Sequence, residues 1–320
     1  MAKFKRVIYP TDKPSVLLDG GLNNKFEKSI IQDNESPSCL NVIFSDGAVG
    51  TREGTTKLNT NAIGAWSLDG LYTRHDRSGS ETMVAFAGGS AWELATTTFT
   101  TIGSAQSVFS LGVRVGAAEY ENHIFVGNGV VTPYKYNGTD WTRHGVPKPS
   151  SLPTVATAPT GNNLTGEFRY GVAFLNSQTV LGDVTSFTAT FTAASEDIRL
   201  TSIPTAPQSH GVNARRLYRT VSSGTTLQVL ATINDNTTTT YDDAISDASL
   251  GAEAPLDNGE PPNYDVIFYH QDRLFMNDPS NPNYVWYTDL TEPYTVQSTN
   301  FLTMGDNTKD LVVGFGKMDV

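Results

Sequence analysis

The stretch that decides the fold class is residues 83–94, with the sequence MVAFAGGSAWEL. Its first five residues are a short apolar run of the kind that forms a buried strand. The Gly-Gly-Ser that follows is a turn signal, and residues 91–94 then form a second short run with a tryptophan in its middle. Two short runs separated by Gly-rich turn residues predict a β-hairpin.

Two further stretches repeat this pattern. Each reads as an apolar strand, a turn rich in Gly, Asn or Pro, and a strand that carries aromatic side chains. The second copy is HIFV (123–126), a turn at 127–129 and PYKY (133–136); the third is RLFM (273–276), a turn at 277–282 and YVWY (284–287). The chain is therefore predicted to contain three similar hairpins.

The spacing of the copies adds information. Val84 and Phe125 are 41 positions apart, whereas Phe125 and Phe275 are 150 positions apart. If one repeat is about 41 residues, about 109 residues are inserted between the second and third copies. A period near 40–50 residues is typical of β-propeller blades with four short strands each. The alternative is three unrelated hairpins in a β-rich fold.

Two proline-rich segments, 147–153 and 255–262, mark the ends of the insertion and read as stiff linkers. The segment between them has the size of one immunoglobulin-like β-sandwich. Its interior shows alternating runs separated by polar turns. These runs are residues 168–174, 184–191, 198–200, 216–219 and 227–233. The excess repeat length and the linker positions thus predict the same inserted module.

The predicted fold class is all-β, with propeller-type blades interrupted by an immunoglobulin or fibronectin III-like sandwich. Residues 33–37 are expected to cap a short helical turn, and residues 311–315 read as a strand. The predicted parts are an irregular N-terminal segment with a hairpin near 42–52 (1–60), propeller-like blades (61–147), the sandwich (148–258) and a further blade, complete or truncated (259–320).

The charge balance argues against a protein that grips nucleic acid. The 320 residues carry a formal net charge of −11, and the basic segment at Lys3, Lys5 and Arg6 reads as a solvated tail. An acidic surface suits solubility, and it also suits a conduit through which DNA slides. The single cysteine, Cys39, predicts no intrachain disulfide and reads as a small buried apolar residue. No signal peptide and no apolar run of membrane-spanning length are recognised, so no membrane insertion is expected.

The sequence contains none of the common catalytic or metal-binding motifs. The five histidines (75, 123, 144, 210 and 270) stand apart, and His123 and His270 at predicted strand edges read as structural residues. No zinc, P-loop or nucleophile-elbow motif occurs, so no catalytic, cofactor-binding or metal residue is predicted and the protein is not expected to be an enzyme. Glycosidase activity, which needs two carboxylates at a set separation, is the enzymatic alternative.

Two residue groups leave alternatives open. Calcium could bind the carboxylates, but without an EF-hand spacing a solvated turn is the favoured interpretation of the group Asp235, Asp242, Asp243 and Asp247. The tryptophans could bind sugar, but because they recur with the repeat, core packing is favoured for the group Trp92, Trp141 and Trp286.

Three stretches are informative through their order along the chain. They are residues 20–23 with 32–37, 40–42 and 47–54; residues 168–174 with 200–204, 214–220 and 236–243; and residues 272–275 with 279–282 and 286–289. The first is similar to the opening of bacteriophage tail hub and nozzle proteins, also known as DNA-stabilisation or tail accessory proteins. The second resembles the immunoglobulin-like or fibronectin-type modules of phage tail proteins, and the third resembles a blade of the hub proteins.

This resemblance implies a structural protein of the virion, in the viral tail or neck, with no cofactor. It implies a homo-oligomeric ring of about six copies that continues the DNA channel below the portal and adaptor proteins. Such a ring retains the genome and conducts duplex DNA during ejection without sequence-specific binding. The alternative is a receptor- or carbohydrate-binding tail protein. Three blades do not close a propeller, which usually has about 4–8, so the chain is a fragment or part of an open or shared arrangement.

Overall fold

A computed structural model describes residues 21–22, 35–36, 42–45, 48–51, 58–102, 108–305 and 310–316. The described residues form an all-β protein of several small sheets, with two short 3₁₀ turns and no closed barrel among them. The chain divides into two compact units, residues 1–58 and residues 59–320. The prediction of an all-β protein is thus confirmed at the level of fold class.

The first unit contains two short strand pairs. The parallel pair is β1 (Gly21–Leu22) with β2 (Glu35–Ser36), and the antiparallel pair is β3 (Val42–Ser45) with β4 (Ala48–Thr51). The β3–β4 pair is the hairpin predicted there. Of the residues expected to cap a short helical turn (33–37), Glu35–Ser36 form a strand that pairs with β1, and the others lie outside the described residues. The basic segment at residues 3–6 and Cys39 lie outside the described residues.

The second unit contains three four-stranded antiparallel sheets. In each, the strands are neighbours in space in the order in which they follow one another along the chain. The first sheet comprises β5 (Leu68–His75), β6 (Glu81–Ala87), β7 (Ser90–Ala95) and β8 (Thr98–Thr101). The second comprises β9 (Gly116–Tyr120), β10 (His123–Gly127), β11 (Tyr134–Tyr136) and β12 (Trp141–Arg143). The third comprises β21 (Ile267–His270), β22 (Arg273–Asn277), β23 (Tyr284–Tyr287) and β24 (Phe301–Thr303).

The three predicted hairpins form the two inner strands of these sheets. They correspond to the pairs β6–β7, β10–β11 and β22–β23. The second and third sheets also share the turn before the inner pair. Glu121 and Asn122 both adopt left-handed backbone angles, as do Gln271 and Asp272, which is the two-residue turn whose twist matches antiparallel strands. The sheets thus resemble one another beyond the residues that suggested a repeat.

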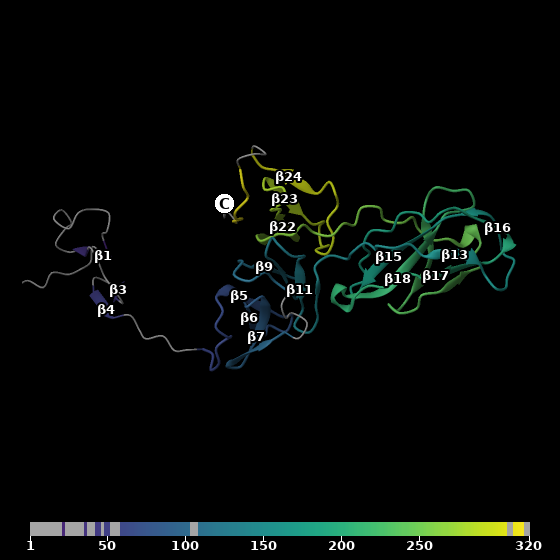
Figure 1. The fold of residues 1–320 in the computed structure, drawn as a ribbon. Helices are drawn as coiled ribbons and strands as arrows, with labels where there is room; N and C mark the ends of the chain where they lie inside the picture. The colour runs from purple at the N-terminus through teal and green to yellow at the C-terminus, as the bar shows by residue number, and fades with distance from the viewer. Residues whose placement is uncertain are drawn as a thin grey trace, which may run out of the picture. The chain divides into compact units, whose positions relative to one another are not determined.

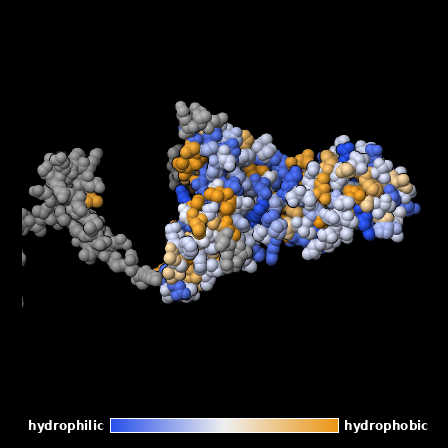
Figure 2. Space-filling model, in the orientation of Figure 1, coloured by the Kyte–Doolittle hydropathy of each residue, from blue (hydrophilic) through white to orange (hydrophobic). Residues whose placement is uncertain are grey.

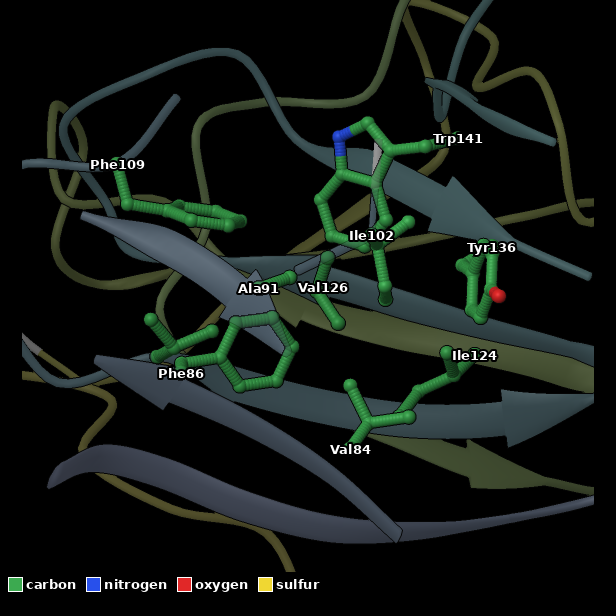
Figure 3. Packing of buried hydrophobic residues seen from close by; sticks show 10 residues of the cluster. Val84, Phe86, Ala91, Ile102, Phe109, Ile124, Val126, Tyr136 and Trp141 are labelled. Carbon is green, nitrogen blue, oxygen red and sulfur yellow. The ribbon is translucent and has the colours of Figure 1, made fainter. Parts of the chain in front are cut away.

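The second sheet packs between the other two, and strand β10 shows how. Ile124 and Val126 belong to an apolar cluster shared with Val84 and Phe86 of the first sheet. Figure 3 shows these side chains converging beneath Trp141 and Phe109. Phe125 points the other way, into a cluster with Leu274 and Met276 of the third sheet. Alternate residues of a strand face opposite sides, so every residue of β10 is buried.

The third sheet joins the second across a gap of more than a hundred residues in the sequence, and Figure 1 shows β9 and β22 in the same part of the second unit. The segment before β21 crosses the second sheet at Gly127. A Cβ atom at Gly127 would overlap the carbonyl oxygen of Tyr264. The glycine in this strand therefore permits a close approach of backbone to backbone.

The inserted segment forms three further small sheets (green in Figure 1). One comprises β13 (Thr154–Thr157), β17 (Ile198–Thr201) and β20 (Tyr241–Asp243), and a second comprises β14 (Leu164–Phe168) and β16 (Phe191–Glu196). The third comprises β15 (Tyr170–Asn176), β18 (Val212–Arg219) and β19 (Gln228–Ile233). The 3₁₀ turns lie at η1 (Gln208–His210) and η2 (Asp247–Ser249).

The three small sheets share one apolar core. Its residues come from all three, with Leu200, Phe168 and Leu217 as one member from each. Four of the five alternating runs predicted in this segment coincide with strands. The run at 184–191 does not, because only Phe191 lies in a strand. Its backbone instead bonds along β15 through the amides of Thr185 and Thr188.

The strand predicted at residues 311–315 is also wrong. Residues 310–316 form no strand, and two bonds hold them to the third sheet and its turn. The amide of Val312 donates to Pro282 O at 2.9 Å. The side-chain amide of Asn277 donates to Val312 O at 3.4 Å. The segment therefore lies against the end of β22 and the turn after it, and it adds no strand to the sheet.

Candidate functional site

The four carboxylates that sequence analysis singled out are each engaged by an arginine. Asp235 meets Arg215 at 2.8 Å and Asp242 meets Arg199 at 2.5 Å. Asp243 and Asp247 both meet the arginine at position 219, each at 2.7 Å. Among the described residues no group of three or more His, Cys, Asp or Glu side chains is arranged to hold a metal ion. The predicted solvated turn is wrong for Asp243, which is fully buried.

Asp243 is the centre of a buried polar network. One carboxylate oxygen accepts bonds from Arg219 at 2.7 Å and from the Tyr170 hydroxyl at 2.8 Å. The other oxygen accepts the backbone amide of Ile245 at 3.0 Å. The guanidinium of Arg219 also lies 4.9 Å from the ring centre of Phe168. Both charges have partners, which a buried ion pair requires, so the network serves to join β15, β18 and β20.

His144 performs a comparable role between the second and third sheets. It is fully buried, and its Nε2 lies 2.6 Å from the carbonyl oxygen of Pro293 while its Nδ1 lies 2.9 Å from the Tyr264 hydroxyl. Because a carbonyl only accepts, Nε2 carries the proton and Nδ1 accepts from the tyrosine. Burial lowers the pKa of His144 to about 3. The ring is therefore neutral, and it joins the two sheets without a charge.

The other histidines have separate surroundings. His123 begins β10 and is buried, with a pKa lowered by burial, and His270 ends β21. His75 is exposed and meets Glu119 at 2.8 Å, which raises its pKa. His210 ends the short turn η1. Within the part of the chain that the structure describes, none of the five belongs to a cluster that could ligate a metal.

Lys135 is a buried cation in the second sheet. Its Nζ donates to the carbonyl oxygen of Arg143 at 2.6 Å and lies 5.4 Å from the ring centre of Tyr294. Burial lowers the pKa of Lys135 to about 8. Lys135 thus forms a hydrogen bond within the second sheet, and its ammonium group also contacts the ring of Tyr294, which lies between strands β23 and β24 of the third sheet in the sequence.

The tryptophans divide into core and surface. Trp141 lies in the apolar cluster between the first two sheets, as expected of a core residue. Trp92 and Trp286 are partly exposed, and each indole donates a hydrogen bond, to Ala87 O and to Asp278 respectively. Trp66 was not among the residues that sequence analysis singled out. It is 59% exposed, so its indole ring is available to a ligand.

Carboxylates gather where the first turns of the second and third sheets meet. We call this group the acidic rim, defined by Glu119, Glu121, Asp272 and Glu292. Three of them, Glu119, Glu121 and Asp272, line a hollow of about 440 Å³. Burial and the nearby carboxylates of Asp289 and Glu121 raise the pKa of Glu292. The sequence held a signal for this group, because EN and QD each immediately precede the repeated apolar strand.

The rim is built on a pair of tyrosines. The rings of Tyr120 and Tyr269 are 5.0 Å apart, and the Tyr269 hydroxyl donates to Asp272 at 2.8 Å. Burial and the surrounding carboxylates Glu121 and Asp272 raise the pKa of Tyr120. The carboxylates are thus held at fixed positions beside two neighbouring sheets and present negative charge on one side of the stack.

No protein-family model matches the chain, and no curated protein matches it. Within the described residues, no helix has the length and apolar character that crossing a membrane requires. The arrangement offers buried polar joints, an acidic rim and partly exposed apolar faces at the ends of the stack.

Proposed function

We propose that this chain is a structural subunit of a bacteriophage tail or neck, which assembles into a ring of hub or nozzle type around the DNA channel. In this proposal the three four-stranded sheets are propeller-type blades, and the inserted sheets are an immunoglobulin-like sandwich that projects from the ring. The ring retains the genome and conducts it during ejection, next to portal and adaptor proteins.

The observation that carries the proposal is the open stack of three sheets. Among the described residues, the second sheet is covered on both faces, whereas the first and the third each have a neighbouring sheet on one face only. Half-exposed apolar side chains remain on both end sheets, such as Leu71 on the first and Leu302 on the third. Exposed apolar patches mark interaction sites, which supports a subunit that functions in an assembly.

The acidic rim supports the conduit part of the proposal. A surface over which duplex DNA slides must not form ion pairs with phosphates, because such pairs supply most non-specific affinity. Carboxylates at Glu121 and Asp272 repel the phosphate backbone. A net charge of −11 over the whole chain acts in the same direction. The rim is therefore the part of the stack that suits a channel wall.

Negative-stain microscopy of the purified chain, with mass determination in solution, tests this function. We expect rings of about six or twelve copies with a central hole wide enough for duplex DNA. A compact trimer without a channel would contradict the proposal and favour a receptor-binding spike. The image and the mass together therefore distinguish the two.

Carbohydrate binding is the second candidate, and the exposed indole of Trp66 favours it. Its ring lies next to Gly88 in the β6–β7 turn, where a Cβ atom would collide with it. An exposed aromatic ring offers an apolar face of the kind that sugars stack on. Titration with host surface glycans, followed by tryptophan fluorescence, would show saturable quenching that Trp66→Ala removes. Unchanged quenching in this variant would exclude Trp66 as the site.

A further inference from the structure

The three sheets stack in the same orientation, so that one side of each of the first two sheets faces the next sheet along the chain. Val84 of the first sheet points to the second sheet, and Phe125 of the second points to the third; both side chains are fully buried. Phe275 is the third member of this series in the sequence repeat. It points away from the second sheet, because its neighbours Leu274 and Met276 are the residues that pack there. Val84 and Phe125 are each covered by the next sheet, whereas Phe275, at the equivalent position of the third sheet, is only partly buried.

The face around Phe275 is an apolar surface that we call the forward face. Phe268, Phe275 and Tyr287 lie opposite one another on three adjacent strands. The rings of Phe275 and Tyr287 are 6.2 Å apart. Leu302 on β24 belongs to the same face, because it pairs with Val285, two residues from Tyr287. Residues 310–316 cover part of this face, because the ring of Phe315 lies 6.4 Å from that of Phe268, and Leu311 and Val313 of that segment are themselves exposed. In Figure 2 an apolar patch lies near the C-terminal end marked in Figure 1.

The outer side of the first sheet is a second apolar surface, partly exposed among the described residues, and we call it the back face. Leu71, Ala85 and Trp92 lie opposite one another on β5, β6 and β7, on the side away from Val84 and Phe86. Leu94 and Phe99 extend the row and are partly exposed. The back face is therefore apolar across all four strands.

We propose that the forward face of one copy packs on the back face of a second copy, head to tail. This contact continues the two interfaces already inside the chain, in each of which the forward side of one sheet meets the back side of the next. A head-to-tail contact repeats from copy to copy and generates a ring when the rotation closes. The inference rests on the proposed ring function and names the surfaces that form it.

Two substitutions at half-exposed positions test the contact in the full chain. Leu71→Asp places a charge on the back face and Leu302→Asp places one on the forward face; 47% and 45% of these residues are exposed, so both variants are expected to fold. Circular dichroism and thermal melting check that they do. Leu256→Asp is the matched control, because Leu256 is 79% exposed and lies on neither face.

Sedimentation over a concentration series measures the outcome. The wild type and Leu256→Asp should self-associate, and each face variant alone should weaken association by more than about tenfold, since a buried unpaired charge is costly. An equimolar mixture of the two face variants should form dimers and nothing larger, because one intact forward face and one intact back face remain.

Other outcomes overturn the contact. A face variant that dimerises alone would show that like faces meet, and a wild type that never associates would show that another segment or partner covers them. If microscopy shows rings that both variants still form, the ring function stands and this contact is wrong. A compact trimer would instead contradict the ring function itself.

Discussion

The stack of three sheets and the inserted sheets differ in the bonded polar pairs that they bury. Between the second and third stacked sheets, His144 forms a neutral buried joint with Tyr264 and Pro293, and the buried cation Lys135 bonds to a carbonyl rather than to a carboxylate. Inside the insertion the joint is ionic, with the carboxylate of Asp243 bonded to Arg219. The insertion encloses one core shared by its three small sheets, whereas the stack ends in half-exposed apolar faces.

This difference separates two kinds of stability. The ion pair of the insertion ties three strands around an enclosed core, so its loss should act within that core. The stack depends on apolar contact between successive sheets, and such contact is non-directional and proportional to the area removed from water. The same kind of surface can therefore continue beyond the chain. The predictions below probe this contrast from the largest effect to the smallest.

Removal of the buried carboxylate should be among the most destabilising single changes. Asp243→Ala leaves the charge of Arg219 buried without its main partner, which should cost about 3–5 kcal/mol of the free energy of unfolding. Asp242→Ala is the matched control on the same strand, and its exposed pair with Arg199 should contribute about 0–1 kcal/mol. Urea unfolding measures both. Equal losses would mean that the insertion is not held by its buried pair.

Truncation of the second sheet's forward residue should have an effect of similar size. Phe125→Ala removes a fully buried ring between two sheets and should cost about 3–5 kcal/mol. Phe275→Ala, at the equivalent position of the third sheet, should cost about 1–2 kcal/mol at concentrations where the chain is a monomer, because the ring is partly in water already. Losses of equal size in dilute solution would show that the forward face is covered within the chain.

Acid should weaken the stack before it weakens the ion pairs. The pKa of His144 is about 3 in the folded chain against an ordinary value of 6.5, so below pH 6.5 the unfolded chain takes up a proton that the folded chain excludes. Stability due to this group is complete above pH 6.5 and should fall by about 2–3 kcal/mol between pH 6.5 and 4.5.

The pH effect has its own control. His144→Gln should flatten the dependence of unfolding free energy on pH over the same interval. The lowered pKa of His123 acts in the same direction, whereas the raised pKa of exposed His75 acts weakly in the opposite one. Urea unfolding at several pH values measures the slope. A slope unchanged by the substitution would assign the acid sensitivity to other groups.

The smallest effect should come from a single hydrogen bond between the first two sheets. The hydroxyl of Tyr136 donates to Glu93 at 2.5 Å. Tyr136→Phe removes this bond and keeps the ring in its cluster, so it should cost about 1–2 kcal/mol. Tyr134→Phe is a control on the same strand. Thermal melting measures both variants. A small loss in Tyr136→Phe would show that contact between the sheets depends mainly on ring packing, as expected, and a large loss would show that it depends on this bond.

Much of the local structure could be predicted from the sequence. The three hairpins around Phe86, Phe125 and Phe275 were found because an apolar run, turn residues and an aromatic strand are local signals with a period of two. The run at 184–191 has the same alternation but bonds along β15 irregularly. Alternation of apolar and polar residues indicates that one side of a segment faces a core. It does not indicate whether a partner strand is available to pair with that segment.

The candidate sites depended more on distant contacts. Nothing adjacent to Asp243 indicated that Arg219 and Tyr170 would surround it, so the carboxylate group read as solvated. The acidic rim was present in the sequence as two dipeptides, yet only the packing of the second sheet on the third brings Glu121 near Asp272. Residues about 150 positions apart meet there, and no local period records such a meeting.

The sequence by itself determined the strands, the hairpins and the place of the insertion, because these follow from side-chain alternation and from where Gly and Pro interrupt it. Tertiary structure decided what each face meets. Gly127 read as part of a turn, but it lies in β10 and admits the backbone of Tyr264. Phe125 and Phe275 look alike in the sequence. Phe125 is fully buried and Phe275 only partly, because burial depends on whether another sheet packs on that face.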